Sequence, residues 1–245
     1  MPEQLWFTHF LNQHLAGVVT PLLQKIGFAP HYPEAPFSNF VAMELLVFVL
    51  LIVFFVLVRT RLSVESPNGL QHIVETIEEF INHQSEEIIG HHSEKFTPFL
   101  VALGLFILVS NLLGLIPGFE SPTASPAVPL GCAILSFFYY NMHGLRKHGA
   151  LKYAKHFLGP LGIVGAVIML PIEIVSHLAR LLSLTVRLWA NMYAGDLVTM
   201  AFFSMIPILV PVVFLGLHLA VAFLQAYIFV LMTMIYLSGA VAEEH

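Results

Sequence analysis

The sequence is poor in charge and has almost no cysteine. Lys, Arg, Asp and Glu make up only 10% of its 245 residues, and the single cysteine, Cys132, lies in an apolar run. One cysteine can form neither a disulfide within the chain nor a cysteine-ligated metal site. The ten Lys and Arg form no basic patch beside aromatic residues, which excludes a nucleic-acid-binding surface. We therefore expect no metal, no cofactor and no nucleic-acid partner.

Long apolar runs take the place of charge. Hydrophobic residues make up 58% of the chain and the mean hydropathy is +0.84, whereas soluble domains are roughly 25% charged. About 20 apolar residues cross a hydrocarbon core. Four regions approach that length: Phe40–Val58, Phe99–Ile116, Leu158–Ile172 with its continuation, and Val212–Tyr236. With a shorter apolar helix at Val128–Met142, the sequence predicts an all-α integral membrane protein with about five membrane helices.

The remaining segments divide the chain. Residues 1–38 are expected to lie outside the membrane, with a short amphipathic helix and then a proline-rich loop at Gly27–Asn39. Residues 39–245 are expected to form a single membrane domain. Within it, apolar residues between Leu70 and Ile88 recur at helical spacing against five glutamates, which is typical of a helix on a membrane surface. We expect this amphipathic surface helix at about 67–90, opened by Pro67.

The positions of lysine and arginine predict the orientation, because cations near the ends of membrane helices stay on the cytoplasmic side. Two groups of cations fall on one side of the expected helices: Arg59, Arg61 and Lys95, and then Arg146, Lys147, Lys152 and Lys155. On the other side stands Lys25 alone. The sequence therefore predicts a multi-pass protein with its N-terminus outside and its C-terminus in the cytoplasm.

The segment after Pro160 predicts an unusually long helix. Up to Ser204 it contains one further proline, Pro171, and no polar loop. As one helix, these ~45 residues would measure roughly 65 Å, about twice the thickness of the bilayer core. Such a helix must be strongly tilted or bent near Pro171. A break at "SMIPILVP" then returns the chain antiparallel, so we expect a tilted helix hairpin at about 160–240.

Polar side chains recur along the first helix of this hairpin. They fall within a sector of roughly 80° at 100° per residue, and we call them the polar seam: Glu173, Ser176, Arg180, Ser183, Arg187 and Asn191. On the returning helix, His218 and Gln225 share a face that Tyr236 continues. Asp196 lies nine residues after Arg187, about 180° away around the helix. It therefore addresses a different space from the arginine.

The charged residues indicate function more strongly than the neutral ones. An Arg or Asp at mid-membrane costs about 2.5–3.5 kcal/mol on insertion scales, and such groups mark ion pathways. This favours function for Arg187, Glu173 and Asp196. Arg180 is equally consistent with snorkelling to water at the interface. Considered by themselves, Ser176 and Ser183 are typical of helix packing. Gln225 and Asn191 are also consistent with contacts between helices.

Arg187 has no obvious counter-charge on its own helix. No acid stands three or four residues away, where a helical ion pair would form. Glu173 is about 21 Å away along the axis, and Asp196 is on the opposite face. Glu44 on the first span remains a candidate. A carboxylate on another chain is the preferred partner, because it also explains a long helix with one polar seam.

Three stretches together closely resemble subunit a, the membrane-embedded stator subunit of F-type ATP synthases. They are "LTVRLWANMYAGDLV", "LQAYIFVLMTMIYLSGAVAEEH" and "NLLGLIPG", and the resemblance spans roughly residues 40–245. It implies a stator subunit of the bacterial inner membrane whose two tilted helices lie against the rotating ring of c subunits. The implied partners are this ring, the b subunits of the peripheral stalk, the other ATP synthase subunits, lipid, and H⁺, with Na⁺ left open.

The resemblance also implies roles for the residues of the seam. Arg187 matches the arginine that faces the proton-carrying carboxylate of the ring. Gln225 and Asn191 match polar residues close to that arginine, and Ser183 matches a polar position one turn before it. The arginine would favour the ionised ring carboxylate and block a direct proton leak.

The remaining polar residues match positions associated with two aqueous half-channels. Asp196 and His218 are expected to form a relay in the outer half-channel, and Glu173 to belong to the inner one or its mouth. Many members of the family have Glu where Asp196 stands. Many also have Asp and Asn where this chain has Ser125 and Pro126, and Glu120 is the candidate to replace the missing polar group.

Other functions fit the sequence less well. A secondary transporter that binds its ion within its own helices would have internal repeats and acids beside the arginine, and the sequence has neither. A voltage sensor needs arginines at every third residue, and an intramembrane protease would carry H-E-x-x-H or G-x-S-x-G. A purely structural scaffold would tolerate neutral residues at positions 173, 187 and 196. The transporter is therefore the main alternative.

Overall fold

The structure is a computed structural model that describes residues 4–25, 35–63, 68–90, 92–116, 118–149, 162–205 and 209–242. Over these ranges the chain is helical and has no strand, which confirms the predicted all-α fold. The α-helices in chain order are α1 (Trp6–Lys25), α2 (Asn39–Thr60), α3 (Gly69–Ile89), α4 (Thr97–Leu113), α5 (Ala127–His148), α7 (Gly162–Met205) and α8 (Leu209–Val241). Two short 3-10 turns, η1 (Ser93–Lys95) and η2 (Pro122–Ala124), precede α4 and α5.

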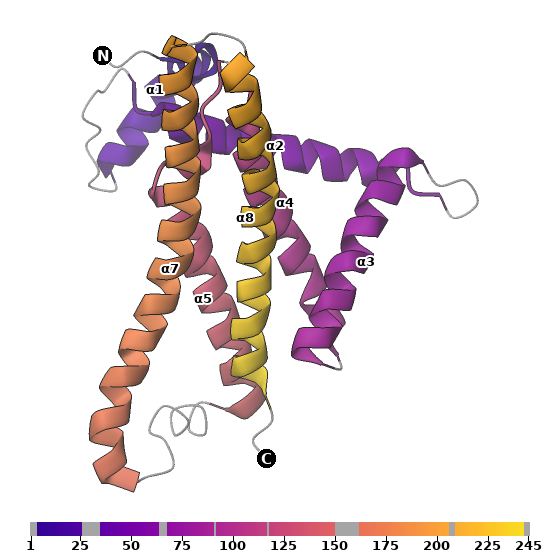
Figure 1. The fold of residues 1–245 in the computed structure, drawn as a ribbon, viewed down its shortest axis with the longest axis vertical. Coiled ribbons are helices and arrows are strands. Elements are labelled where there is room, and N and C mark those ends of the chain that lie inside the picture. The colour runs from indigo at the N-terminus through magenta and orange to yellow at the C-terminus, as the bar shows by residue number, and fades with distance from the viewer. Residues whose placement is uncertain are drawn as a thin grey trace.

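Helices α7 and α8 form the predicted long hairpin. α7 has 44 residues and α8 has 33, so α7 is about 66 Å long at 1.5 Å per residue. Pro171 lies inside α7, which continues through it. The predicted break is confirmed, since α7 ends at Met205 and α8 begins at Leu209. The two helices pack together near the break and diverge toward the start of α7 (Figure 1).

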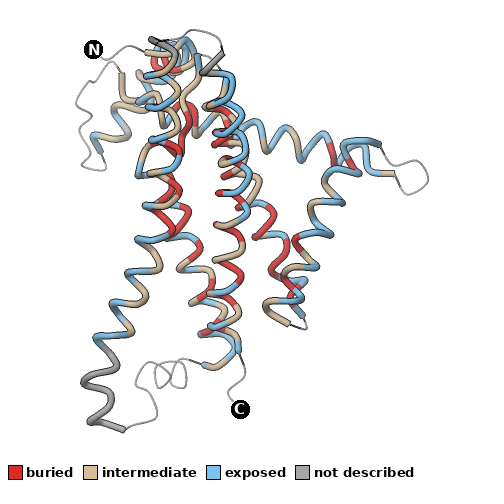
Figure 2. Tube along the Cα trace, viewed as in Figure 1, coloured by how far each residue is buried: buried red, intermediate tan, exposed pale blue. Residues whose placement is uncertain are grey.

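Helices α4 and α5 pack against the hairpin and form the core with it. One buried cluster joins Ile107 of α4, Leu188 of α7 and Phe229 of α8. Gly104 allows α4 to approach α8 closely, because a Cβ at this position would lie 3.0 Å from the side chain of Val230. Buried residues lie along the inward sides of these helices (Figure 2). This core fixes the relative positions of the polar residues on α7 and α8.

Helix α2 runs crosswise to the hairpin (Figure 1). Its large apolar side chains are widely exposed, including Phe48 at 57% and Val53 at 49%, whereas Met43 is fully buried. Lipid would cover an apolar surface of this kind. Two described segments are long and apolar enough to cross a membrane, α2 and Val212–Val241, and α4 is a shorter apolar helix. Together with α5 and α7 they correspond to the five expected membrane helices.

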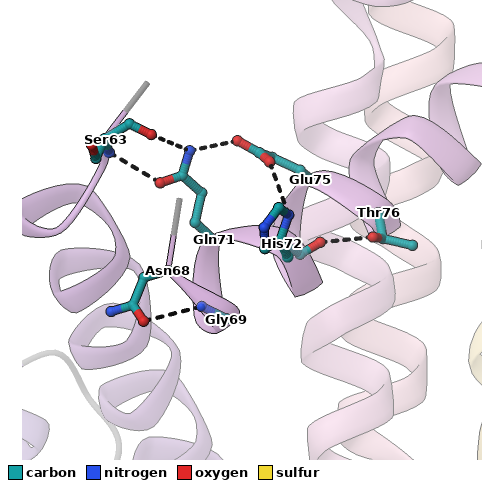
Figure 3. Close-up of polar contacts among 7 residues, drawn as sticks. All are labelled: Ser63, Asn68, Gly69, Gln71, His72, Glu75 and Thr76. Atoms are coloured by element: carbon teal, nitrogen blue, oxygen red, sulfur yellow. Dashed lines mark hydrogen bonds and ion pairs between the residues drawn. The ribbon is translucent and has the colours of Figure 1, made fainter. Parts of the chain in front are cut away.

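The predicted amphipathic helix is present as α3, although its expected opening at Pro67 lies outside the described residues. The side chain of Asn68 caps it by accepting a hydrogen bond from the Gly69 N–H (3.0 Å) (Figure 3). Gln71 accepts from the N–H of Ser63 (3.1 Å) and donates to its carbonyl (3.2 Å). It also donates to Glu75 (2.7 Å). These bonds tie the chain leaving α2 to the first turn of α3.

Several helix ends differ from the prediction. α4 ends at Leu113 instead of Ile116, because Gly114 starts a turn and its Cα lies against Ser121. α5 extends through Gly144 to His148 instead of ending at Met142, because no proline follows Met142 before Gly149 and cations are favourable at a helix C-terminus. α1 is longer than the short helix expected, since no cluster of turn-forming residues follows until Gly27.

Candidate functional site

The polar seam lies at the border of an exposed face of α7. Ser183 and Asn191 are exposed and Arg187 is half-buried. The Arg187 guanidinium donates a hydrogen bond to the hydroxyl of Ser183, with 3.2 Å between Nη2 and Oγ. Among the described residues, no carboxylate lies within 4.0 Å of this guanidinium. In the described part of the chain, the charge of Arg187 is therefore matched by one neutral hydroxyl and no acid.

Arg180 has a different environment. Its guanidinium lies over the ring of Tyr236 on α8, 5.2 Å from the ring centroid. Such a cation–π contact contributes about 0.5–2 kcal/mol and holds the two helices together. Ser176, one turn earlier, is half-buried. Arg180 and Tyr236 thus form a packing contact between α7 and α8, separate from Arg187.

Asp196 and His218 meet between α7 and α8, and the predicted position of Asp196, about 180° around the helix from Arg187, is consistent with this contact. Asp196 Oδ1 lies 3.8 Å from His218 Nδ1. The histidine is buried, with 5% of its surface exposed. Its Nε2 is buried and has no hydrogen-bond partner among the described residues. Because buried polar atoms are almost always hydrogen-bonded, this nitrogen is a natural contact for a water molecule.

Gly195 makes room for the histidine. A Cβ at this position would lie 3.0 Å from both Cε1 and Nδ1 of His218 and 3.2 Å from Cγ. These distances are tighter than nine in ten real Cβ contacts, so the imidazole would have to shift by a few tenths of an ångström. The glycine that precedes Asp196 therefore sets the position of the histidine on the neighbouring helix.

On the relay role that the resemblance to subunit a implies for His218, replacing Gly195 with alanine is expected to lower proton transport by about fivefold, the equivalent of about 1 kcal/mol of a displaced polar contact. Stability should be maintained or increased, because alanine favours a helix over glycine by about 1 kcal/mol. Gly216→Ala is the matched control, since a Cβ there meets nothing within 4 Å. ATP-driven proton pumping and thermal unfolding would be measured for both variants. Equal pumping by the two would show that the position of His218 does not matter.

Glu120 adds a second acid near this pair. It lies in the connection between α4 and α5, where its carboxylate accepts a hydrogen bond from the Asn39 side chain (3.2 Å). It is close enough to Asp196 for the two charges to interact. The adjoining turn η2 packs on α7. The predicted candidate Glu120 is thus brought to the same end of the hairpin as Asp196 and His218.

A groove of about 470 Å³ lies beside the histidine, between α7 and α8. Four polar side chains line it: Asn191, Thr199, His218 and Gln225. Gln225 is buried, with 6% of its surface exposed. His218 and Gln225 line the same groove, which confirms that they share a face of α8. The groove thus extends from the buried histidine to Asn191, the residue of the polar seam one turn after Arg187.

A second polar group lies toward the other end of α7. Glu173 Oε1 lies 3.4 Å from His177 Nε2, and His177 Nδ1 is 3.0 Å from the hydroxyl of Tyr140 on α5. The two rings stack with 16° between their planes. Sequence reasoning assigned no role to His177 or Tyr140. The structure joins them to the predicted residue Glu173.

A buried polar network fixes the loop between α4 and α5. Asn111 donates to the carbonyl of Ala222 on α8 (3.2 Å) and accepts from the hydroxyl of Thr123 (2.6 Å). Ser121 is within hydrogen-bond distance of Thr123 (2.7 Å) and donates to the carbonyl of Ser110 (3.1 Å). Sequence reasoning missed this network. An asparagine within an apolar span was the available signal, because such residues commonly bond across membrane helices.

The geometry also bears on Glu44 and on metal binding. Glu44, a candidate partner for Arg187, lines a separate and mostly apolar cavity of about 390 Å³ together with Phe99 and Cys132. For metals, no three His, Cys, Asp or Glu side chains gather as a binding site would require in the part of the chain that the structure describes. The described site offers titratable side chains and the fixed charge of Arg187.

Comparisons with known proteins identify the family. The model of the ATP synthase A chain family matches residues 41–238. ATP synthase subunit a of Koribacter versatilis (strain Ellin345) is 53% identical over 245 residues, covering 100% of both chains. ATP synthase subunit a of Solibacter usitatus (strain Ellin6076) is 50% identical over 234 residues, covering 96% of this chain and 99% of that protein. The chain belongs to the family of ATP synthase subunit a, a membrane protein of proton transport and ATP synthesis.

Proposed function

We propose that this chain forms two aqueous half-channels of the ATP synthase membrane sector and presents Arg187 to the proton-carrying carboxylate of the c ring. Family membership supports the proton-translocating role itself. The observation that carries the finer assignment is the environment of Arg187. Its guanidinium is half-buried beside an exposed face, and its hydrogen-bond partner is the neutral Ser183. An arginine does not deprotonate in a protein, so a carboxylate from outside the chain is the fitting counter-charge.

The arginine would act on that carboxylate electrostatically. An opposite charge within about 4–6 Å favours the ionised form of an acid. A protonated ring carboxylate that approaches Arg187 would therefore release its proton on one side of the arginine. After passing, it would take up another proton on the other side. The fixed positive charge would also repel a proton moving directly between the half-channels.

The outer half-channel would run from the Asp196–His218 pair into the groove. Asp196 and Glu120 supply acids at its entrance, and a water molecule between Asp196 and His218, which are 3.8 Å apart, would pass a proton from one to the other. The Nε2 of His218 would continue the path into the groove that Gln225 lines. Asn191, on the opposite wall, belongs to the polar seam and leads toward Arg187.

The inner half-channel would contain the group around Glu173. This carboxylate lies beside His177, which is within hydrogen-bond distance of Tyr140. Each of the three side chains has a protonated and a deprotonated form and can therefore take up and release a proton. Glu173 lies fourteen residues before Arg187, about 21 Å along the helix. The two half-channels would thus end on opposite sides of the arginine.

The orientation and the partners follow from this arrangement. The N-terminus would lie outside a bacterial inner membrane and the C-terminus in the cytoplasm, since Arg146 and Lys147 follow the last apolar turns of α5. The polar seam and the flanking part of α8 would face the c ring. The exposed apolar surface of α2 would be covered by lipid and by the b subunits of the peripheral stalk.

Disulfide cross-linking in the assembled complex tests the assignment. Ser183→Cys and Asn191→Cys, in a Cys132→Ala background, should each cross-link to a cysteine placed one turn from the ring carboxylate. Leu178→Cys is the matched control, because Leu178 is also exposed on α7 but lies on the other side of the helix. Cross-linking at position 178 in preference to 183 and 191 would reject the proposed ring surface. Ion transport by the chain in vesicles without any ring would favour the secondary transporter.

A further inference from the structure

A third cavity, of about 720 Å³, lies away from the proposed proton path. It is enclosed by the ends of α3, α5 and α8 and by the turn that leads into α4. Five lining residues carry basic side chains: His92, Lys95, His143, Arg146 and Lys147. The others are Ile89, Phe96, Val241 and Ala242. We call this cavity the cationic pocket.

The charged side chains among the described residues that line the pocket are cations. They are Lys95, Arg146 and Lys147, and no carboxylate lines the pocket among the described residues. Lys147 donates to the carbonyl of Val241 (2.8 Å), and Lys95 lies over the ring of Phe96 at 4.8 Å. Three helices end here, and cations are favourable beside a helix C-terminus, which carries a partial negative charge.

The turn that carries Lys95 is held in an unfavourable backbone conformation. His92 has φ 68° and ψ 24° and is the only non-glycine residue with positive φ among those that the structure describes. Such conformations are uncommon for residues with a side chain and concentrate at functional sites. The residue turns the chain from α3 into η1. The imidazole and Lys95 both line the pocket.

We infer that the cationic pocket binds the phosphate headgroup of an anionic phospholipid. Lys and Arg donate charge-assisted hydrogen bonds to phosphate oxygens. Ile89, Phe96 and Val241 belong to or pack against the core cluster at this end of the membrane helices, so the pocket combines a charged rim with an apolar base. Basic pockets between membrane helices on the cytoplasmic side are typical headgroup sites. A lipid fits this combination better than a soluble anion, which would gain nothing from the apolar base.

The inference is independent of the proposed proton path and can be tested on the purified chain. Full-length protein in detergent would be titrated with short-chain phosphatidylglycerol while its thermal unfolding midpoint is recorded. Phosphatidylglycerol should raise the midpoint, whereas zwitterionic phosphatidylcholine should not. The double variant Lys95→Ala/Arg146→Ala should need about 30-fold more phosphatidylglycerol, since each cation near a membrane surface contributes about fivefold in affinity.

The matched control is Arg59→Ala/Arg61→Ala. It removes the same charge on the same side of the membrane from two exposed residues outside the pocket and should bind phosphatidylglycerol like the unaltered chain. If the double variant at the pocket does not fold, the single variant Lys95→Gln should show the fivefold loss. An equal loss of phosphatidylglycerol affinity in the control would indicate that the lipid binds to general surface charge. Competition by inorganic phosphate at similar concentration would indicate a soluble anion. Normal lipid binding by the double variant at the pocket, together with loss of the peripheral stalk from the ATP synthase complex assembled with that variant, would indicate a protein interface. Each of these three results would overturn the inference.

Discussion

Replacing Arg187 with alanine is expected to abolish ATP-driven proton pumping by the assembled complex in vesicles. The substitution removes the fixed charge that favours ionisation of the approaching ring carboxylate, so the proton is no longer released before the next is taken up. It also removes the barrier between the half-channels, so passive proton leak down an imposed gradient should rise. Quenching of a pH-sensitive dye after ATP addition measures pumping, and its decay after an imposed pH step measures leak.

Loss of folding would not explain that result. A guanidinium at mid-membrane costs about 2.5–3.5 kcal/mol on insertion scales, and the contact given up is one hydrogen bond to Ser183. Arg180→Ala is the matched control because it removes an arginine from the same helix, and with it the contact to Tyr236. This control should keep most of its pumping. Coupled transport at normal rates by Arg187→Ala would contradict the proposed role.

The helical period alone predicted most of the hairpin. Pro160 to Ser204 contains no strong breaker except Pro171, which a helix in a membrane can accommodate, and the structure has one helix through that proline. Helix ends were harder to predict, because they depend on contacts made elsewhere. α4 stops at Leu113 where Gly114 meets Ser121 of the following loop. That close approach involves a residue seven positions away, and local propensity does not encode it.

The candidate site was predictable where one helix determines it. Residues spaced by three or four fall on one side of α7, and nine residues turn Asp196 to the other, so its separation from Arg187 followed from counting. The contacts between helices did not follow. The pairing of Tyr140 with His177 depends on the register between α5 and α7, and the bond of Asn111 to Ala222 depends on that between α4 and α8. Packing of the core sets both registers.

The proposed function assigns two different tasks to charged residues of α7. Arg187 would keep its charge and block proton passage, and its surroundings offer the neutral Ser183. Asp196 would gain and lose protons, and it meets His218 of α8. An acid on the arginine's own face would form an internal ion pair and compete with the ring carboxylate. Asp196 lies on the opposite side of the helix from Arg187, which avoids that competition.

Replacing Asp196 with alanine is expected to lower ATP-driven proton pumping by at least about a hundredfold, the low end of the effect of removing a positioned proton-transfer group. Asp196→Glu is the matched control and should keep most of the activity. The 3.8 Å separation of Oδ1 and Nδ1 exceeds a hydrogen bond of about 2.7–3.2 Å, so the longer side chain can close the distance and preserve the charge. Pumping rates at matched levels of assembled complex would be compared.

His218→Ala distinguishes a relay from a single essential acid. If proton transfer requires the Asp196–His218 contact, His218→Ala should lose about as much pumping as Asp196→Ala, and the double variant should lose little more, because residues that act as a unit are not additive. Multiplied losses in the double variant would mean that the two side chains act independently. Normal pumping by Asp196→Ala would remove the acid from the path and leave Glu120, which interacts with the same position, as the acid to test next.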